Sequence, residues 1–266
     1  MDPIVADLLN LVLRWIHVVA GILWIGHLYF FNFVNAQLAK SYDADSKAKV
    51  VPQLMPRALY WFRWGSFFTW VTGVLLIGIV YHVGKLMVDY GTTQRPGIAA
   101  GVGFAFILFG FFLYDVLWKV LGKNELVAGI ISFLLLAGLS YLFHQLMSGR
   151  AAYIHLGSVL GATMMMNVWM RIWPAQKKII RGIRGEQPAP DASVAAAAAL
   201  RSKHNVYMSI PLTFFMVSNH YPIVYSTPEP GFNTHGFIHS LIIIAVGFGV
   251  AKFLFVKSAS DAPTKA

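Results

Sequence analysis

The sequence predicts an all-α protein, a polytopic membrane helix bundle with about seven transmembrane helices. Hydrophobic residues make up 57% of its 266 residues and charged residues only 12%, whereas soluble domains carry about 25% charged residues. The apolar residues are also gathered into separate runs, each close to the roughly 20 residues that cross a bilayer as a helix. In chain order these runs are Leu8–Val34, Arg57–His82, Ile98–Trp118, Leu126–Leu146, Tyr153–Trp173, His204–Tyr221 and Gly236–Phe255.

The sixth run is the shortest and has polar residues at both ends. Arg201 to Asn205 precede its apolar part, Ser218 to Pro222 end it, and Pro211 lies inside it. A proline within a membrane helix frees backbone groups that neighbouring groups must satisfy. Polar side chains at both ends of such a run are typical of a functional membrane helix, so this stretch is a candidate part of a site.

The basic residues indicate how the chain is oriented, because Lys and Arg accumulate in cytoplasmic loops. The other side of the membrane receives only Lys85, Arg95 and Arg150. We therefore expect an N-terminus outside, a cytoplasmic C-terminus and anionic lipids at the cytoplasmic face. The net charge of +10 is explained by this pattern, and no nucleic-acid partner is expected. The basic residues on the expected cytoplasmic side are Lys40, Lys47, Lys49, Arg57, Lys119, Lys123, Lys177, Lys178, Arg181, Arg184, Arg201, Lys203, Lys257 and Lys265.

One integral membrane domain is expected over residues 1–257, with a cytoplasmic connector at about 175–203. Gly185 to Asp191 reads as a turn-rich linker, and Ser193 to Lys203 as an alanine-rich surface helix. Asp191 or Ser193 is placed to cap that helix. Residues 258–266 are small and polar, and we expect a disordered tail there.

The chain has nine histidines and no cysteine. Without cysteine, covalent c-type haem and thiolate-bound clusters are excluded. Histidines in an apolar chain indicate a haem b site, a metal site or a proton path, although His82, His144 and His235 also suit the membrane interface. His17 falls about 13 Å into its helix, near the bilayer midplane, with Gly21 one turn later leaving space beside it.

Two further patterns concern residues that could bind a ligand or a partner side chain. His235 and His239 share a helix face, but no carboxylate stands between them, so no metal site is expected. Asn167 is a buried amide that requires a partner, for which a hydrogen bond to another helix is the simplest account.

Several motifs, spread over nearly the whole chain, occur together. They are Arg14–His17, Gly21–Gly26, Trp61–Trp64, Thr69–Gly73, Tyr153–Gly157, Asn167, Pro174–Lys178, Arg201–Asn205 and Ser218–Pro222. In these motifs the chain resembles the membrane domain of the cytochrome c-linked urate oxidases, also called urate hydroxylases. The stretch Asn35 to Pro56 departs from that family, which carries a longer, glycine-rich and histidine-containing connection there.

The resemblance implies a redox protein of the bacterial inner membrane that oxidises urate to 5-hydroxyisourate. It implies His204, Asn205, Asn219 and His220 as catalytic candidates, and non-covalent haem b held by His17, His155 or His220. In that family the electrons pass to a fused cytochrome c domain. This chain lacks cysteine and ends after the seventh run, so a separate cytochrome c or other acceptor is expected.

An alternative hypothesis is a non-catalytic membrane subunit. Such a subunit would bind haem b and relay electrons without acting on a purine. The residues leave both hypotheses open, because histidine supplies acid–base chemistry and ligands but no side chain accepts electrons.

Overall fold

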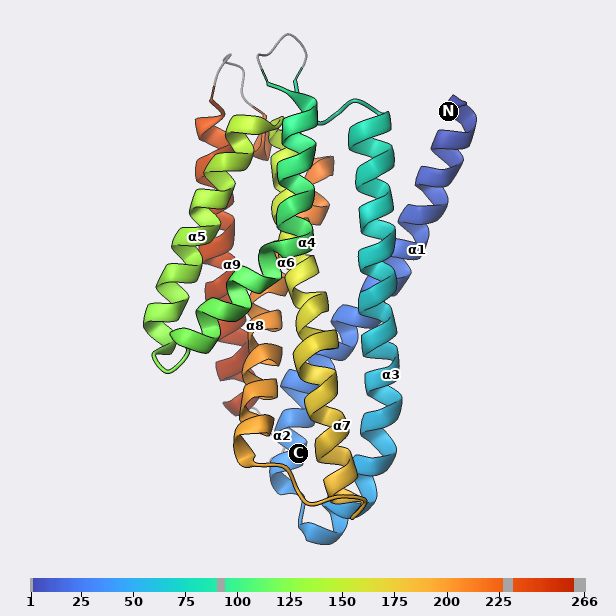
Figure 1. Cartoon of the computed structure of the whole chain (residues 1–266), viewed down its shortest axis with the longest axis vertical. Helices are drawn as coiled ribbons and strands as arrows, with labels where there is room; N and C mark the ends of the chain where they lie inside the picture. Colours follow the sequence, from blue (N-terminus) through green and yellow to red (C-terminus); the bar gives the residue numbers. More distant parts are fainter. Residues whose placement is uncertain (1, 90–93, 227–231, 261–266) are drawn as a thin grey trace. The chain divides into compact units, whose positions relative to one another are not determined.

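The computed structural model describes residues 2–89, 94–226 and 232–260, and in these residues the regular elements are helices without any strand (Figure 1). Within that part of the chain, seven helical stretches follow the order of the seven apolar runs, which confirms the all-α prediction. Their elements are α1 Pro3–Tyr29, η1 Phe30–Asn35, α2 Ala36–Leu38 and η2 Ala39–Ser41; α3 Ala44–Ile77 and η3 Gly78–Val83; α4 Pro96–Val120; α5 Glu125–Leu146; α6 Gly149–Asn167, η4 Val168–Ile172 and α7 Trp173–Ile183; α8 Ala192–Val217 and η5 Ser218–His220; and α9 Thr234–Ser260. The short turn η6, Pro222–Val224, follows η5.

Five of these stretches, among the described residues, are long and apolar enough to cross a membrane, which indicates a multi-pass membrane protein. The stretch from α3 through η3 has 40 residues, about 60 Å of helix, whereas the hydrocarbon core is about 30 Å thick. This helix therefore extends beyond the apolar layer. The orientation of the termini stays a prediction. The five stretches are Pro3–Ser41, Ala44–Val83, Pro96–Val120, Glu125–Leu146 and Thr234–Ser260.

The chain divides into two compact units. Unit 1 comprises Met1–Asn10, Val74–Thr163 and Ile210–Gly247, and unit 2 comprises Leu11–Gly73, Met164–Ser209 and Phe248–Ala266. The division falls inside α1, α3, α6, α8 and α9 rather than in loops. The single domain expected over residues 1–257 stays a prediction.

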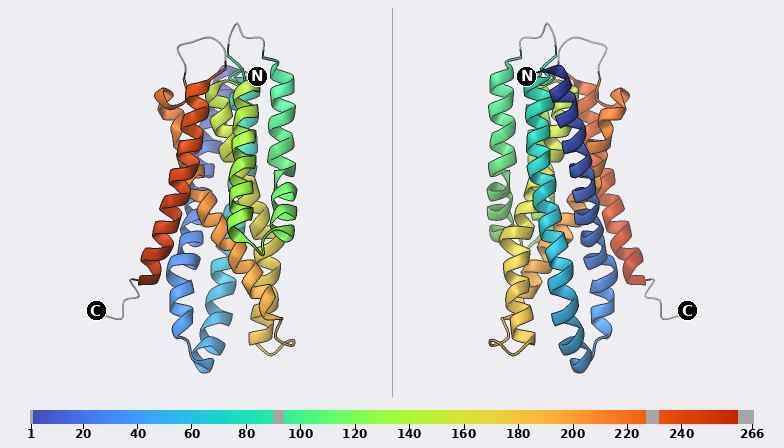
Figure 2. Two further views of the ribbon diagram at one scale, coloured as in Figure 1. Left: turned by 90° about the vertical axis from the view of Figure 1, so that its left-hand side faces the viewer. Right: turned by 90° about the vertical axis from the view of Figure 1, so that its right-hand side faces the viewer.

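Unit 1 is packed around buried aromatic side chains. Helices α4 and α5 lie side by side and are joined by a short turn (Figures 1 and 2). The fully buried ring of Tyr153 lies edge-on to Phe215, with the centroids 5.3 Å apart. Its hydroxyl reaches the carbonyl oxygens of Val224 at 2.9 Å and Gly236 at 3.0 Å. Burying an aromatic ring while pairing its polar end is what a core tyrosine requires.

Unit 2 has its own aromatic core and one arginine among tryptophans. Phe31 and Phe62 pack edge-to-face with centroids 5.3 Å apart. The guanidinium of Arg63 lies 4.3 Å from the ring centroid of Trp173 and 5.1 Å from that of Trp169. Aromatic faces attract a cation, so the charge of Arg63 is stabilised without a carboxylate in the described residues.

The connector between α7 and α8 matches the expected turn. Helix α7 ends before Gly185, whose φ of +74° is the left-handed conformation that glycine adopts most easily. Asp191 caps α8 by accepting a hydrogen bond from the backbone N–H of Ser193 at 2.8 Å. The hydroxyl and N–H of Ser193 hold the pKa of Asp191 below its usual value.

The alanine-rich segment is not a separate surface helix. It forms the first part of α8, which continues unbroken through Pro211 to Val217. A helix can pass a proline when its neighbours leave room for the proline ring and when another group satisfies the freed carbonyl. Gly247 provides that space, because a Cβ there would lie 2.7 Å from Cδ of Pro211. At the C-terminus α9 extends to Ser260, and residues 261–266 of the expected tail lie outside the described residues.

Replacing Gly157 by leucine is expected to destabilise unit 1. A Cβ at Gly157 would lie 2.9 Å from Cε of Met216 and 3.0 Å from Cβ of Phe215. Overpacking of this kind costs about 1–3 kcal/mol. A thermal unfolding scan in detergent should show a clearly lower Tm for Gly157→Leu. Gly138→Leu is the matched control, since nothing lies within 4 Å of a Cβ at Gly138, and equal Tm values for the two variants would contradict the packing described.

Candidate functional site

A polar cluster in unit 1 joins three helical segments. The side-chain oxygen of Asn219 accepts a hydrogen bond from Nε of Arg150 at 3.0 Å and one from the hydroxyl of Tyr81 at 3.3 Å. The Tyr225 hydroxyl lies 3.4 Å from the backbone oxygen of Asn219. Tyr81 belongs to the π-helical segment η3, Arg150 to the first turn of α6, and Asn219 to η5. One amide thus holds together a cation and a phenol from distant parts of the sequence.

His155 lies beside this cluster with one ring nitrogen unpaired. Its ring is edge-on to Tyr81, with the centroids 5.8 Å apart. Nδ1 lies 2.8 Å from the carbonyl oxygen of Ala151, and since a carbonyl only accepts, Nδ1 carries the proton. Nε2 therefore has the lone pair, and it is fully buried without a hydrogen-bond partner among the described residues. A buried, unpaired imidazole nitrogen can accept a proton or bind a ligand.

The space around His155 limits what can bind to Nε2. A Cβ at Gly103 of α4 would lie 2.9 Å from Nε2 and 2.6 Å from Cδ2, so the backbone of α4 approaches this side of the ring closely. Methyl Cε of Met147 borders the same point, 3.1 Å from that Cβ. A porphyrin bound through Nε2 would need the space that α4 fills. His155 therefore fits proton transfer and does not fit a haem ligand in this arrangement.

His17, in unit 2, is also held by a neighbouring side chain. The hydroxyl of Thr72 donates to the carbonyl of Phe68 at 2.6 Å, so its oxygen accepts from Nδ1 of His17 at 3.1 Å. This again leaves the lone pair on Nε2, with the ring fixed by a neighbour, as is usual for ligating histidines. Around Gly21, the nearest neighbour of an added Cβ is Thr69 Cγ2 at 3.9 Å. On another side, a Cβ at Gly73 would lie 3.1 Å from Cε1 of His17, so the backbone of α3 approaches this ring closely.

The other predicted residues lie at two places. His220 is exposed in the 3-10 turn η5, directly after Asn219. His204 and Asn205 are buried in α8 within unit 2. The side-chain oxygen of Asn205 accepts from the amide of Asn167 at 2.9 Å, and its own amide donates to the carbonyl of Met164 at 3.0 Å. This is the hydrogen bond between helices that Asn167 was expected to make.

A family model, that of the urate oxidase N-terminal family, matches residues 3–49 and 42–265. The chain belongs to the urate oxidase N-terminal family. The two matched parts overlap at 42–49, in the connection after the first apolar run. Neither the curated proteins nor the solved structures contain a match.

In this member of the urate oxidase N-terminal family, sequence reasoning missed two residues of the cluster. Tyr81 belongs to none of the motifs, and Arg150 enters the sequence prediction only as one of three basic residues expected outside. Their positions in the sequence could have drawn attention to them, because each lies near a histidine. Arg150 is five residues before His155, and Tyr81 directly precedes His82. Neither spacing indicates Asn219 as their partner.

His144 was expected to suit the membrane interface, but its side chain is buried inside unit 1. It is buried in α5 with Nδ1 2.8 Å from the carbonyl of Ser140, and its Nε2 has no partner in the described part of the chain. Across the described ranges, no group of three or more His, Asp or Glu residues could hold a metal ion.

Replacing Asn219 by leucine is expected to destabilise unit 1, because Arg150 Nε and the Tyr81 hydroxyl would both lose their acceptor. Leaving a partly buried donor unpaired costs about 1–3 kcal/mol. Thermal unfolding of Asn219→Leu and Asn219→Asp should separate the loss of the accepting oxygen from the general effect of replacing the side chain. The aspartate keeps the accepting oxygen, so its Tm should stay near that of the wild type. An unchanged Tm for Asn219→Leu would show that the cluster contributes nothing to stability.

Proposed function

We propose that this chain is the membrane component of a urate-oxidising system. The reaction is urate plus water giving 5-hydroxyisourate, two protons and two electrons. The family match across 3–49 and 42–265 is the observation that carries the proposal. The cluster of unit 1 supports it, because it supplies groups suited to a planar anion and to proton removal.

Arg150 is the proposed anchor for the urate anion. A guanidinium pairs with planar anions through two parallel hydrogen bonds, and Arg150 is held in place by Nε, which donates to Asn219. Asn219 and Tyr81 orient the guanidinium. Nε2 of His155 is the proposed base, since it carries a lone pair without a hydrogen-bond partner among the described residues and imidazole can serve as a general base.

The electrons require a group that the side chains do not supply. Non-covalent haem b is the proposed acceptor, held through Nε2 of His17, and it would take up electrons and release them to an external carrier. The chain has no cysteine, so a c-type haem must lie outside these 266 residues. We propose a separate cytochrome c as the next carrier. His204, Asn205 and His220 stay candidates for roles in the same reaction.

The second candidate is a haem-binding relay without activity on urate. The histidine tautomers favour it as much as they favour the enzyme, because a lone pair on Nε2 serves electron-transfer haem equally well. The two candidates differ in one property, which is whether urate itself reduces the haem.

The test is spectroscopy of the purified protein with urate as the reductant. Oxidised-minus-reduced spectra should show a b-type haem, and urate should reduce both it and added cytochrome c. His17→Ala should lose the haem band. His155→Gln should keep the band and lose about a hundredfold or more of urate-dependent reduction, the usual contribution of a general base.

His235→Ala is the control for these variants, since His235 is exposed in unit 1 and outside the cluster. It should behave as the wild type does. A haem that dithionite reduces and urate does not would favour the relay. A folded, haem-free protein expressed with ample haem supply would overturn the haem proposal, and full turnover in His155→Gln would remove His155 as the base.

A further inference from the structure

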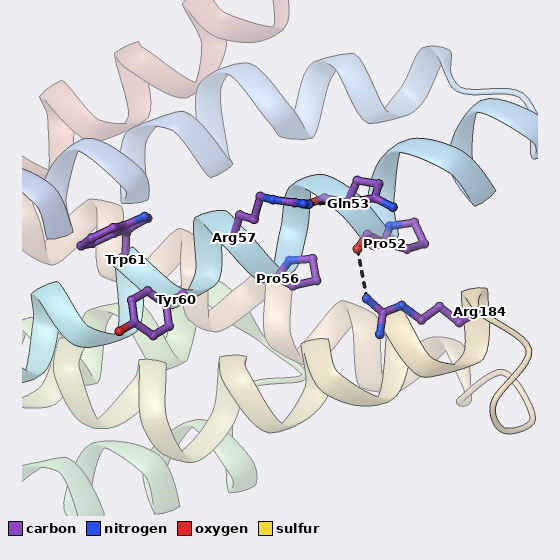
Figure 3. Close-up of a pocket in the computed structure, with 7 residues that line it drawn as sticks. All are labelled: Pro52, Gln53, Pro56, Arg57, Tyr60, Trp61 and Arg184. Atoms are coloured by element: carbon purple, nitrogen blue, oxygen red, sulfur yellow. Dashed lines mark hydrogen bonds between the residues drawn. The ribbon is translucent and has the colours of Figure 1, made fainter.

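Unit 2 contains a pocket of about 500 Å³ where the beginning of α3 faces the end of α7 (Figure 3). This volume lies within the range of small-molecule sites. None of the site residues discussed above lines it. Its wall consists of Pro52, Gln53, Pro56, Arg57, Tyr60, Trp61 and Arg184.

Two prolines explain why α3 and the end of α7 meet here. Pro56 has no backbone N–H, so the carbonyl of Pro52, four residues earlier, loses its partner within the helix. Nη2 of Arg184 donates to that carbonyl at 3.1 Å, which is the dashed contact in Figure 3. Arg184 is the last residue before the turn at Gly185. The contact therefore fixes one guanidinium at the edge of the pocket.

The pocket carries two positive charges and no carboxylate in its wall. Nη1 of Arg57 donates to the backbone oxygen of Gln53 at 2.6 Å and to its side-chain oxygen at 2.9 Å. Among the described residues Arg57 has no acidic partner. Arg184 has an exposed contact with Glu186 at 3.4 Å, and exposed pairs of this kind are weak. Most donors of both guanidinium groups are thus available to an anion.

The position of the pocket along α3 indicates a membrane surface. Arg57 begins the apolar run to His82, whereas the 13 residues from Ala44 to Pro56 include Asp45, Lys47 and Lys49. Tyr60 and Trp61 in the wall are 48% and 53% exposed. Tryptophan and tyrosine concentrate at the level of the lipid headgroups.

The helix that leads to Arg184 is also rich in positive charge. Helix α7, Trp173–Ile183, contains Lys177, Lys178 and Arg181 and no acidic residue. Clusters of cations beside a membrane segment attract anionic lipids. The two guanidinium groups, the exposed aromatic rings and the junction of polar and apolar helix therefore all suit one ligand chemistry.

We infer that this pocket binds the phosphate group of an anionic phospholipid headgroup. Arg57 and Arg184 pair with the phosphate oxygens, and Tyr60 and Trp61 lie against the glycerol and the start of the acyl chains. Guanidinium groups are suited to phosphate because they present paired donors in one plane. The site is independent of the proposed oxidation of urate.

The test measures lipid binding to the full chain by native mass spectrometry. Protein from nanodiscs containing 30% phosphatidylglycerol in phosphatidylcholine should retain phosphatidylglycerol in preference to phosphatidylcholine. The double variant Arg57→Gln/Arg184→Gln should retain about tenfold less phosphatidylglycerol, since two charge-assisted contacts are lost. Arg57→Gln alone should show part of this loss, and its fold should be intact because Arg57 bonds only within its own helix turn.

The matched control is Lys40→Gln/Lys47→Gln, which removes the same charge from exposed positions outside the pocket wall. It should retain phosphatidylglycerol within about threefold of the wild type. Equal losses in the two double variants would overturn the inference in favour of a diffuse surface charge. Suppose that millimolar inorganic phosphate displaces the lipid and raises the Tm of the protein as much as phosphatidylglycerol does. This result would overturn the inference in favour of a free anion.

Discussion

The absence of water in a bilayer is the constraint from which the rest of this structure follows. A polar group in the apolar layer must find its partner within the protein, either in its own helix, as Thr69 and Ser158 do, or in another helix. Ser140 and Ser240 pair across α5 and α9 at 2.6 Å, and Asn167 and Asn205 pair at 2.9 Å. These contacts are few, and they occur where the helix surfaces approach each other closely. The polar side chains thus specify which helices meet, while the apolar majority fills the remaining space.

Three π-helical segments interrupt the long helices, and each one coincides with polar contacts. A π-helical turn adds a residue to the turn and changes the direction of the side chains that follow, which is why such segments are common at functional sites. Asn32 in η1 donates to Ser202 at 2.8 Å, and Tyr81 in η3 donates to Asn219. Asn167 immediately precedes η4. A regular helix over the same residues would turn these side chains toward other neighbours.

The helices could be predicted because hydrophobicity over 20 residues is a strong signal, whereas the site could be predicted only in part. All seven runs lie in helices, and Asn167 and Asp191 have the roles expected of them. The π-helical turns could not be foreseen, because they depend on partners such as Asn219 that lie more than a hundred residues from Tyr81. The continuity of α8 through Pro211 depends likewise on Gly247 of another helix. Pairings of this kind are properties of the packed chain and leave no local pattern.

The two buried histidines with unpaired Nε2 atoms are the strongest indication that unit 1 does more than hold the fold. Leaving a buried acceptor without a partner costs about 1–3 kcal/mol, and His144 and His155 both do so. Leucine or methionine would fill the same space without that cost, as Met147 and Met164 do elsewhere in the core. In each histidine, Nδ1 donates to the backbone carbonyl four residues earlier in the same helix. This hydrogen bond determines the tautomer and leaves the lone pair on the buried Nε2. Such an arrangement is explained by a proton or ligand that reaches Nε2 during function, and His155 lies edge-on to Tyr81, which shares Asn219 with Arg150.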